Sequence, residues 1–229
     1  MTNPSAVDVT AGYYQAGLGL RLFRVALGTF EKLWPAFAVR AATRIFCTPL
    51  PPKWMHRRAS AGADWRIQHW AFEDASLTVY SRPATPHGPV ALLVHGWGGH
   101  ASQLLPLAES LAQHGIRPVL LEMPGHGRSA GSTSSLPQFA RAIEYAAGRL
   151  QQEGHRIGLL AAHSLGASAA AYAASRGVAA AKLVLIAPPA SPRAYTRYFA
   201  KVFGLSEATR SAMQKRIEAR EALPGHARD

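Results

Sequence analysis

Ser164 is the residue whose neighbours most clearly suggest chemistry. It follows the apolar run "LLAAH" and precedes the alanine-rich segment "LGASAAAYAA". This pattern predicts a sharp turn from a buried strand into a helix, and such a turn pushes the serine Oγ out from the edge of a sheet. The turn needs small residues two before and two after the serine, and Ala162 and Gly166 occupy these positions. Ser164 is therefore a candidate nucleophile.

Two further segments contain the small residues that an acyl-transfer site needs. The segment "HGWGGH" at residues 95–100 follows one apolar run directly, and "MPGHGRS" at residues 123–129 follows the next. Small residues let backbone N–H groups approach a ligand. Acyl transfer needs such donors for the oxyanion that forms at the attacked carbonyl. Both segments thus agree with the interpretation of Ser164.

A sheet must position these three segments. Continuous apolar runs, typical of strands buried on both faces, alternate with helical patterns at about 102–114, 136–150 and 165–176. The alternation predicts an α/β fold with a mainly parallel sheet and flanking helices. Upstream, "WRIQHWAFEDASLTVYSRP" predicts a hairpin that turns at Glu73 and Asp74. The predicted strands are "PVALLVHG", "RPVLLEMPG", "RIGLLAAH" and "AKLVLIAPP".

The order strand–HG–helix, strand–PGHGxS–helix, strand–xHSxG–helix resembles the α/β-hydrolase family over roughly residues 65–190. The resemblance implies hydrolysis of an ester or similar acyl bond, without a metal or an organic cofactor. It implies that Ser164 is the nucleophile and that the N–H groups of Trp97 and Leu165 form the oxyanion hole. The residues that belong to the same motifs and support them are His95, Gly96, His163 and Gly166.

The resemblance also bears on the other polar residues of these segments. The family's general base follows the nucleophile and the acid in the chain, so we interpret His95, His126 and His163 as hydrogen-bonding groups of tight turns. Glu122 stands where the family often has Asp. We expect this departure to affect loop packing rather than chemistry.

The chain after Ser164 does not show the family's acid and base. Residues 195–220 read as helices at the start of a cap region, and their aromatic stripe favours an apolar substrate. The two strands that should follow are not evident, so we interpret the chain as a fragment or an early-ending product. We do not expect Ser164, Glu221 and His226 to form a triad, because His226 lies near the chain end with no strand before it.

The N-terminal region is basic and amphipathic. The chain has a formal charge of +12, and residues 13–47 predict two helices divided at Pro35. Two interpretations stay open: these helices pack on the domain or on a partner, or they form an interfacial membrane anchor. We divide the chain into an N-terminal helical extension (1–60), a hydrolase core (61–192) and the start of a cap (193–229).

Two functions therefore follow from the sequence. The first is a serine hydrolase of an apolar acyl substrate, and the alternative is a catalytically incomplete α/β-hydrolase that binds a partner, a lipid or a membrane. The single Cys47 excludes an internal disulfide and favours a cytoplasmic protein, with peripheral contact to the inner face of a membrane under the anchor interpretation. The absence of a zinc-finger spacing or an RNP-type motif argues against a nucleic-acid partner. The sequence does not indicate an oligomeric state.

Overall fold

The computed structural model describes residues 18–55, 62–82, 88–189 and 191–221. Two compact units divide the chain. The sheet unit comprises residues 47–189, and the helical unit combines residues 1–46 with residues 190–229. Each unit is described by itself below.

The sheet unit contains one six-stranded sheet with the order β1-β2-β4-β3-β5-β6. Strands β4, β3, β5 and β6 run parallel, whereas the β1–β2 hairpin pairs antiparallel with β4 through β2. The expected hairpin turn is confirmed, since Phe72 pairs with Ala75. The strands are β1 (Arg66–Phe72), β2 (Ala75–Ser81), β3 (Val90–Val94), β4 (Arg117–Glu122), β5 (Ile157–His163) and β6 (Lys182–Ile186).

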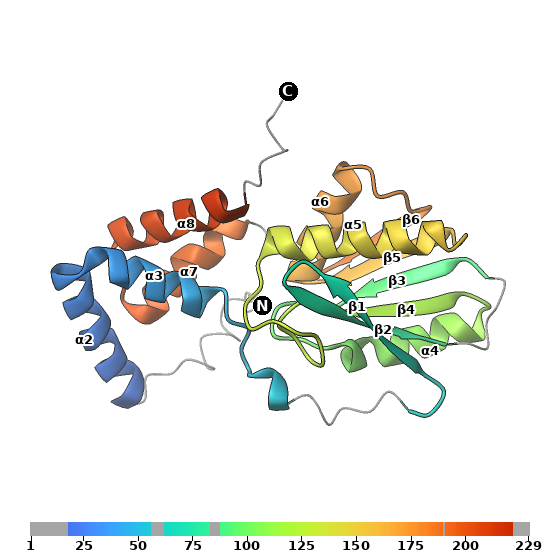
Figure 1. Cartoon of the computed structure of the whole chain (residues 1–229), viewed down its shortest axis with the longest axis horizontal. Coiled ribbons are helices and arrows are strands. Elements are labelled where there is room, and N and C mark those ends of the chain that lie inside the picture. Colours follow the sequence, from blue (N-terminus) through green and yellow to red (C-terminus); the bar gives the residue numbers. More distant parts are fainter. Residues whose placement is uncertain (1–17, 56–61, 83–87, 190, 222–229) are drawn as a thin grey trace, which may run out of the picture. The chain divides into compact units, whose positions relative to one another are not determined.

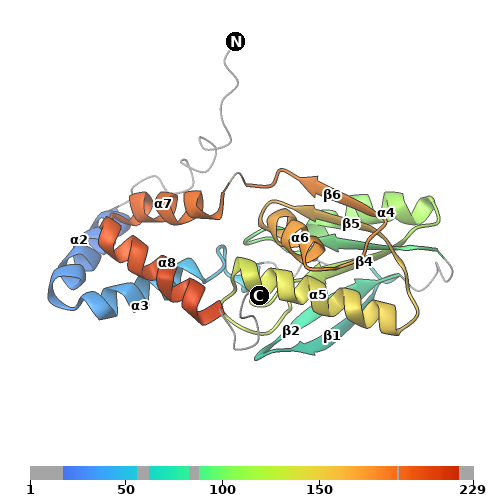
Figure 2. The same ribbon diagram turned by 90° about the horizontal axis from the view of Figure 1, so that it is seen from above.

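Helices cover both faces of the sheet, as the alternation of strands and helices predicted (Figure 1 and Figure 2). Val90, Leu92 and Val94 of β3 pack in one core cluster with α5 (Leu136–Gln152) and α6 (Leu165–Ser175). Ala91 and Leu93 pack on the opposite face with the 3-10 turn Ala101–Leu104 and with α4 (Leu105–Gln113). Strand β3 is therefore buried on both faces, which explains its continuous apolar sequence.

Strand β6 differs from the other parallel strands. It pairs with β5, and it lies at the end of the sheet among the described residues. All five of its residues are exposed, and four of them are large and apolar: Leu183, Val184, Leu185 and Ile186. The sequence of β6 has the apolar character of a buried strand, but its surroundings in the described part of the chain do not bury it.

The helical unit contains α2 (Leu18–Leu33), α3 (Pro35–Phe46), α7 (Pro192–Phe203) and α8 (Glu207–Glu221). The expected division at Pro35 is confirmed, because α2 ends at Leu33 and α3 begins at the proline. Helix α2 contacts α3 and α7, and α3 contacts α8. Each of the two N-terminal helices thus packs one of its faces on the C-terminal helices. Within the described ranges, no helix combines the length and the apolar character needed to cross a bilayer.

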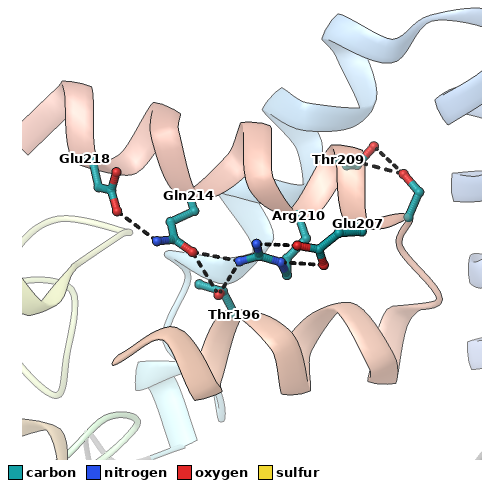
Figure 3. A network of polar contacts seen from close by, with 7 residues as sticks. Thr196, Glu207, Thr209, Arg210, Gln214 and Glu218 are labelled. Carbon is teal, nitrogen blue, oxygen red and sulfur yellow. Dashed lines mark hydrogen bonds and ion pairs between the residues drawn. The ribbon is translucent and has the colours of Figure 1, made fainter. Parts of the chain in front are cut away.

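A polar network joins α7 to α8 (Figure 3). Arg210 lies at its centre and is only 9% exposed. Its guanidinium donates to Thr196 Oγ1 at 3.1 Å, to Gln214 Oε1 at 2.7 Å and, through Nε, to Glu207 Oε2 at 2.8 Å. The buried charge is therefore surrounded by acceptors from both helices, as a charge out of water requires.

Candidate active site

Ser164 occupies the sharp turn that its sequence predicts. Strand β5 ends at His163 and α6 begins at Leu165, so Ser164 alone makes the turn. Its backbone has φ 52° and ψ −122°, a conformation that a residue with a side chain adopts at a cost of about 1–3 kcal/mol. The N–H of Ser164 donates to the carbonyl of Ile186 at 2.9 Å, and its carbonyl accepts the N–H groups of Ala167 and Ser168. These bonds hold the strained residue in place.

The turn lies directly against the loop that follows β3. A Cβ placed on Gly166 would overlap the carbonyl oxygen of His95. One placed on Gly96 would lie 2.9 Å from the Cβ of Ser164 and 3.2 Å from the Nδ1 of His163. Both glycines are therefore required by contacts between the two segments, and the loop after β3 runs along one side of Ser164.

Trp97 follows Gly96 in the chain, and Leu165 follows Ser164. Among the described residues, the hydrogen bonds include none donated by the backbone N–H of either one. The Trp97 ring packs against His126, with 5.3 Å between ring centroids, and against Phe139 at 6.4 Å. This packing joins the loop after β3 to the loop after β4 and to α5. Leu165 is thus the chain neighbour of Ser164, and Trp97 is the chain neighbour of Gly96, which lies against Ser164.

His95 and His126 use both ring nitrogens in hydrogen bonds to the backbone. His95 Nδ1 lies 2.7 Å from the carbonyl of Gly96, and its Nε2 accepts the N–H of Met123 at 3.1 Å. His126 Nδ1 lies 2.9 Å from the carbonyl of Pro124, and its Nε2 accepts the N–H of Gly98 at 3.1 Å. The two rings join the loops after β3 and β4. In these bonds each ring is neutral and donates from Nδ1.

Electrostatics favour the same neutral state for His95. Complete burial lowers the pKa of His95 well below its usual value, and the neighbouring His126 adds to the shift. A neutral ring whose nitrogens are both hydrogen-bonded has no lone pair left to accept a proton from Ser164. His95 therefore positions the loop after β3, and it does so as a buried imidazole at neutral pH.

Glu122 binds the same loops from the end of β4. Its buried carboxylate accepts the N–H of Ala101 at 3.2 Å, the N–H of Arg128 at 2.8 Å and the hydroxyl of Tyr80 at 3.1 Å. Burial, together with the charge of Glu122, raises the pKa of Tyr80 above its usual range. A Cβ on Gly127 would overlap this carboxylate. The Glu122 carboxylate thus occupies the space that the lack of a side chain at Gly127 leaves open.

The sequence did not indicate Tyr80, and it placed Ser129 in a motif without indicating its contacts. The hydroxyl of Tyr80 comes from β2, and Ser129 joins β2 to the loop after β4. Ser129 Oγ donates to the carbonyl of Glu122 at 2.7 Å and accepts the N–H of Thr78 at 2.8 Å. Both roles depend on the pairing of β2 with β4, which local sequence patterns do not reveal.

The remaining candidates are His163, which borders the turn, and two residues of the C-terminal region. His163 ends β5 and is exposed. Within the described ranges, no histidine is hydrogen-bonded to the hydroxyl of Ser164. Glu221 is the last residue of α8 in the helical unit, and His226 lies outside the described residues. The structure therefore brings together Ser164, Gly96, Trp97, Leu165, Gly166, His95 and His163 around one turn.

Comparisons with known proteins agree with this fold. The model of the alpha/beta hydrolase family matches residues 91–227, more than half of the chain. The turn at Ser164 and the mainly parallel sheet define a protein of the α/β-hydrolase class. The chain belongs to the alpha/beta hydrolase family.

Particular relatives match over shorter stretches. A pimeloyl-[acyl-carrier protein] methyl ester esterase of Xanthomonas campestris pv. campestris (strain B100) is 42% identical over 59 residues, 25% of this chain and 23% of that protein. The enzyme of the same name from Xylella fastidiosa (strain M12) is 38% identical over 61 residues, 26% and 24% of the two chains. The match thus spans about a quarter of these relatives. The esterase Est1E from Butyrivibrio proteoclasticus, solved with ferulic acid, aligns with a TM-score of 0.49 and 21% identity over 57% of this chain and 56% of that chain.

Proposed function

We propose that the chain carries the nucleophile and the oxyanion hole of a serine hydrolase that cleaves carboxylic esters or similar acyl bonds. The backbone of Ser164, held at φ 52° between β5 and α6, carries the proposal. That strained conformation directs a hydroxyl out of the sheet at a helix N-terminus. Gly96 and Gly166 allow the loop after β3 to approach it closely.

The proposed reaction uses the groups around this turn. Ser164 Oγ attacks the carbonyl carbon of the ester while a general base takes its proton. The N–H groups of Trp97 and Leu165 hold the oxyanion of the tetrahedral intermediate. The intermediate expels the alcohol, which receives the proton, and leaves an acyl-serine. Water then attacks the acyl-serine with the help of the same base and releases the carboxylic acid and the free Ser164 hydroxyl.

The base and its acid are expected outside the site residues described above. His95 and His126 have no free ring nitrogen, and the family resemblance places the base late in the chain. Without a base the serine remains a neutral and weak nucleophile. Where no base reaches Ser164, we therefore expect an ester to be turned over slowly.

The relatives support an acyl ester as the substrate class. The curated proteins that match are named as methyl ester esterases of an acyl group on a carrier protein. The aromatic stripe of α7 does not bear on the acyl group, because Phe199 packs against Phe46 of α3 within the helical unit, with 5.2 Å between ring centroids. We propose an acyl ester as the substrate.

The alternative is a catalytically incomplete α/β-hydrolase that binds a partner. The exposure of β6 favours it, because this strand presents four large apolar side chains. Under this alternative, Ser164 stays unreactive in a folded chain. The reactivity of Ser164 therefore distinguishes the two functions.

The test is labelling with a fluorophosphonate, followed by mass spectrometry of the labelled peptide. We expect the label on Ser164 and its loss in Ser164→Ala. Ser168→Ala is the matched control, because Ser168 lies one turn further along the same helix and should not affect labelling. Labelling that persists in Ser164→Ala, or no labelling of a folded protein that contains both the acid and the base, would contradict the proposal.

A further inference from the structure

Helix α2 is amphipathic, but its apolar face is turned away from the helical unit. Val25 and Leu33 are 70% and 60% exposed, and Leu22 of the same face is 63% exposed. The opposite side of the helix carries the contacts that hold it. Arg24 Nε donates to the carbonyl of Val202 at 2.7 Å, and Glu31 accepts the N–H of Ser206 at 3.0 Å. Polar groups and the buried Leu27, which is 5% exposed, thus attach α2 to the unit, whereas Leu22, Val25 and Leu33 are exposed.

Aromatic side chains extend this apolar face at the turn between α2 and α3. Trp34 is 57% exposed and Phe37 is 55% exposed. Phe30 links them, with ring centroids 5.8 Å from Trp34 and 5.3 Å from Phe37. A cluster of this kind has a large apolar area and an indole N–H, a combination typical of residues at the interface between a membrane and water.

The charge around this face has one sign. Residues 18–46 contain five Lys and Arg and a single acid, Glu31, and the contact with Ser206 holds that acid toward α7 and α8. Lys32, Arg40 and Arg44 are exposed. Arg24 and Lys32 also line a shallow groove of about 380 Å³ along α2. A cationic margin around an exposed apolar face is complementary to a surface that is negative outside and apolar beneath.

From this juxtaposition we propose that α2 and the turn into α3 bind the surface of an anionic lipid bilayer. The apolar face (Leu22, Val25, Phe30, Leu33, Trp34 and Phe37) enters the boundary between headgroups and acyl chains. The flanking Lys32, Arg40 and Arg44 contact lipid phosphates. The helix lies in the plane of the surface, because its contacts with Val202 and Ser206 keep its opposite side on the helical unit. This inference does not depend on the reactivity of Ser164.

The test measures binding of the full chain to vesicles. We expect binding to vesicles of phosphatidylcholine with phosphatidylglycerol and at least tenfold weaker binding to phosphatidylcholine alone. Raising the salt from about 0.1 M to about 1 M shortens the Debye length from about 10 Å to about 3 Å and should release much of the protein. Arg40→Gln should weaken binding about fivefold, the effect of about 1 kcal/mol per basic residue near such a surface.

Substitutions on the apolar face test the insertion itself. The double variant Val25→Gln with Leu33→Gln should bind at least tenfold more weakly, and circular dichroism should show an unchanged fold because both residues are exposed. The matched control is Val184→Gln with Leu185→Gln on β6, which removes similarly exposed apolar side chains from the sheet unit. This control should bind vesicles as the original chain does.

Tryptophan fluorescence gives an independent measurement. Anionic vesicles should shift the emission to shorter wavelength, and Trp34→Phe should remove the shift while binding persists. Equal binding to neutral and anionic vesicles, or unchanged binding by the Val25/Leu33 double variant, would overturn the proposal. So would a dimer in light scattering that binds no vesicles and becomes a monomer in the double variant, because the face would then bind a second copy of this chain.

Discussion

The sheet unit and the helical unit both contain buried polar side chains with hydrogen-bond partners, but what lies around these side chains differs. In the sheet unit, β3 is entirely buried, and the polar groups beside it have backbone partners, as Glu122 and His95 do. In the helical unit, Arg210 is buried among acceptors while Val25 and Leu33 face outward. Polar side chains hold each unit together locally, and in the sheet unit they hold the loop that lies against the strained Ser164.

The proposed serine site and the proposed lipid surface make different demands on the two units. A chemical site needs groups held close to their working positions, and the contacts among β3, β4 and the turn at Ser164 provide this. A surface for lipid needs exposed apolar area and charge, and α2 provides both. We therefore expect substitutions in the sheet unit to have large effects on folding and on labelling, and substitutions in the helical unit to have smaller effects on folding.

Gly166→Val should have the largest effect. Its side chain would overlap the carbonyl oxygen of His95, and backbone cannot move aside cheaply. We expect a loss of more than about 3 kcal/mol in the free energy of unfolding and no fluorophosphonate labelling. Urea denaturation measures the first quantity. Gly148→Ala in α5 is the control, because nothing lies near a Cβ there, and it should stabilise the chain by up to about 1 kcal/mol. Equal losses of stability in the two variants would show that the close contact between Gly166 and His95 is not what limits the side chain at position 166.

Glu122→Gln should have the next largest effect. The amide keeps the shape of the side chain but replaces one acceptor oxygen with a donor, which faces the N–H groups or the Tyr80 hydroxyl. A buried donor without an acceptor costs about 1–3 kcal/mol, so we expect a loss of about 2 kcal/mol by urea denaturation. Glu144→Gln, which alters a partly exposed ion pair with Arg176, should change stability much less. A Glu122→Gln chain as stable as the original would show that the hydrogen bonds of the carboxylate do not stabilise the fold.

His95 should make the stability of the sheet unit depend on pH. Its folded pKa lies well below the unfolded value of about 6.5, so the unfolded chain binds more protons in the interval between them. Stability is therefore present above pH 6.5 and falls as the pH drops below it, by about 1.4 kcal/mol per pH unit. His95→Gln should reduce this slope between pH 6.5 and the onset of acid unfolding. An unchanged slope would show that groups other than His95 cause the loss of stability at low pH.

Arg210→Met should have a small effect on the helical unit. It removes the donors to Thr196 and Gln214 and leaves these groups to bind each other and water. We expect the melting temperature to fall by about 3 °C. Glu207→Gln should lower it less, because the Glu207 carboxylate is mostly exposed. If Arg210→Met destabilised the chain as strongly as Gly166→Val, the two units would not differ as we describe.

Acid should weaken the Arg210 contact in a defined direction. The hydrogen bond from Arg210 lowers the pKa of Glu207 below its usual value. The contribution of the pair is therefore present above the unfolded pKa of Glu207 and is lost as the pH falls through the lower folded value.

The local features of the fold could be predicted from the sequence. The division at Pro35, the hairpin turn and the turn at Ser164 depend on neighbouring residues, and all three are present. The expected helix over 102–114 differs in its first turn. Residues 101–104 form a 3-10 turn, and α4 begins at Leu105 with Pro106 in its first turn, where proline needs no N–H partner.

The contacts between elements could not be predicted from the sequence. The three donors to Glu122 come from β2, from the turn after β3 and from the loop after β4, so the network exists only once these segments meet. The amphipathic pattern of α2 shows which residues share a face, but it does not show which face is covered. In the same way, the apolar sequence of β6 indicated a strand without indicating that its side chains are exposed.

The strained backbone of Ser164 has an evolutionary consequence. A glycine at position 164 would adopt φ 52° without the steric penalty that a side chain meets there. A lineage selected for stability alone would therefore gain from that replacement. The hydroxyl of Ser164 is therefore present at a cost in backbone strain that a glycine would not carry. Comparison of the free energies of unfolding of Ser164→Gly and Ser164→Ala measures this strain, because both variants lack the hydroxyl and only the first relieves the backbone.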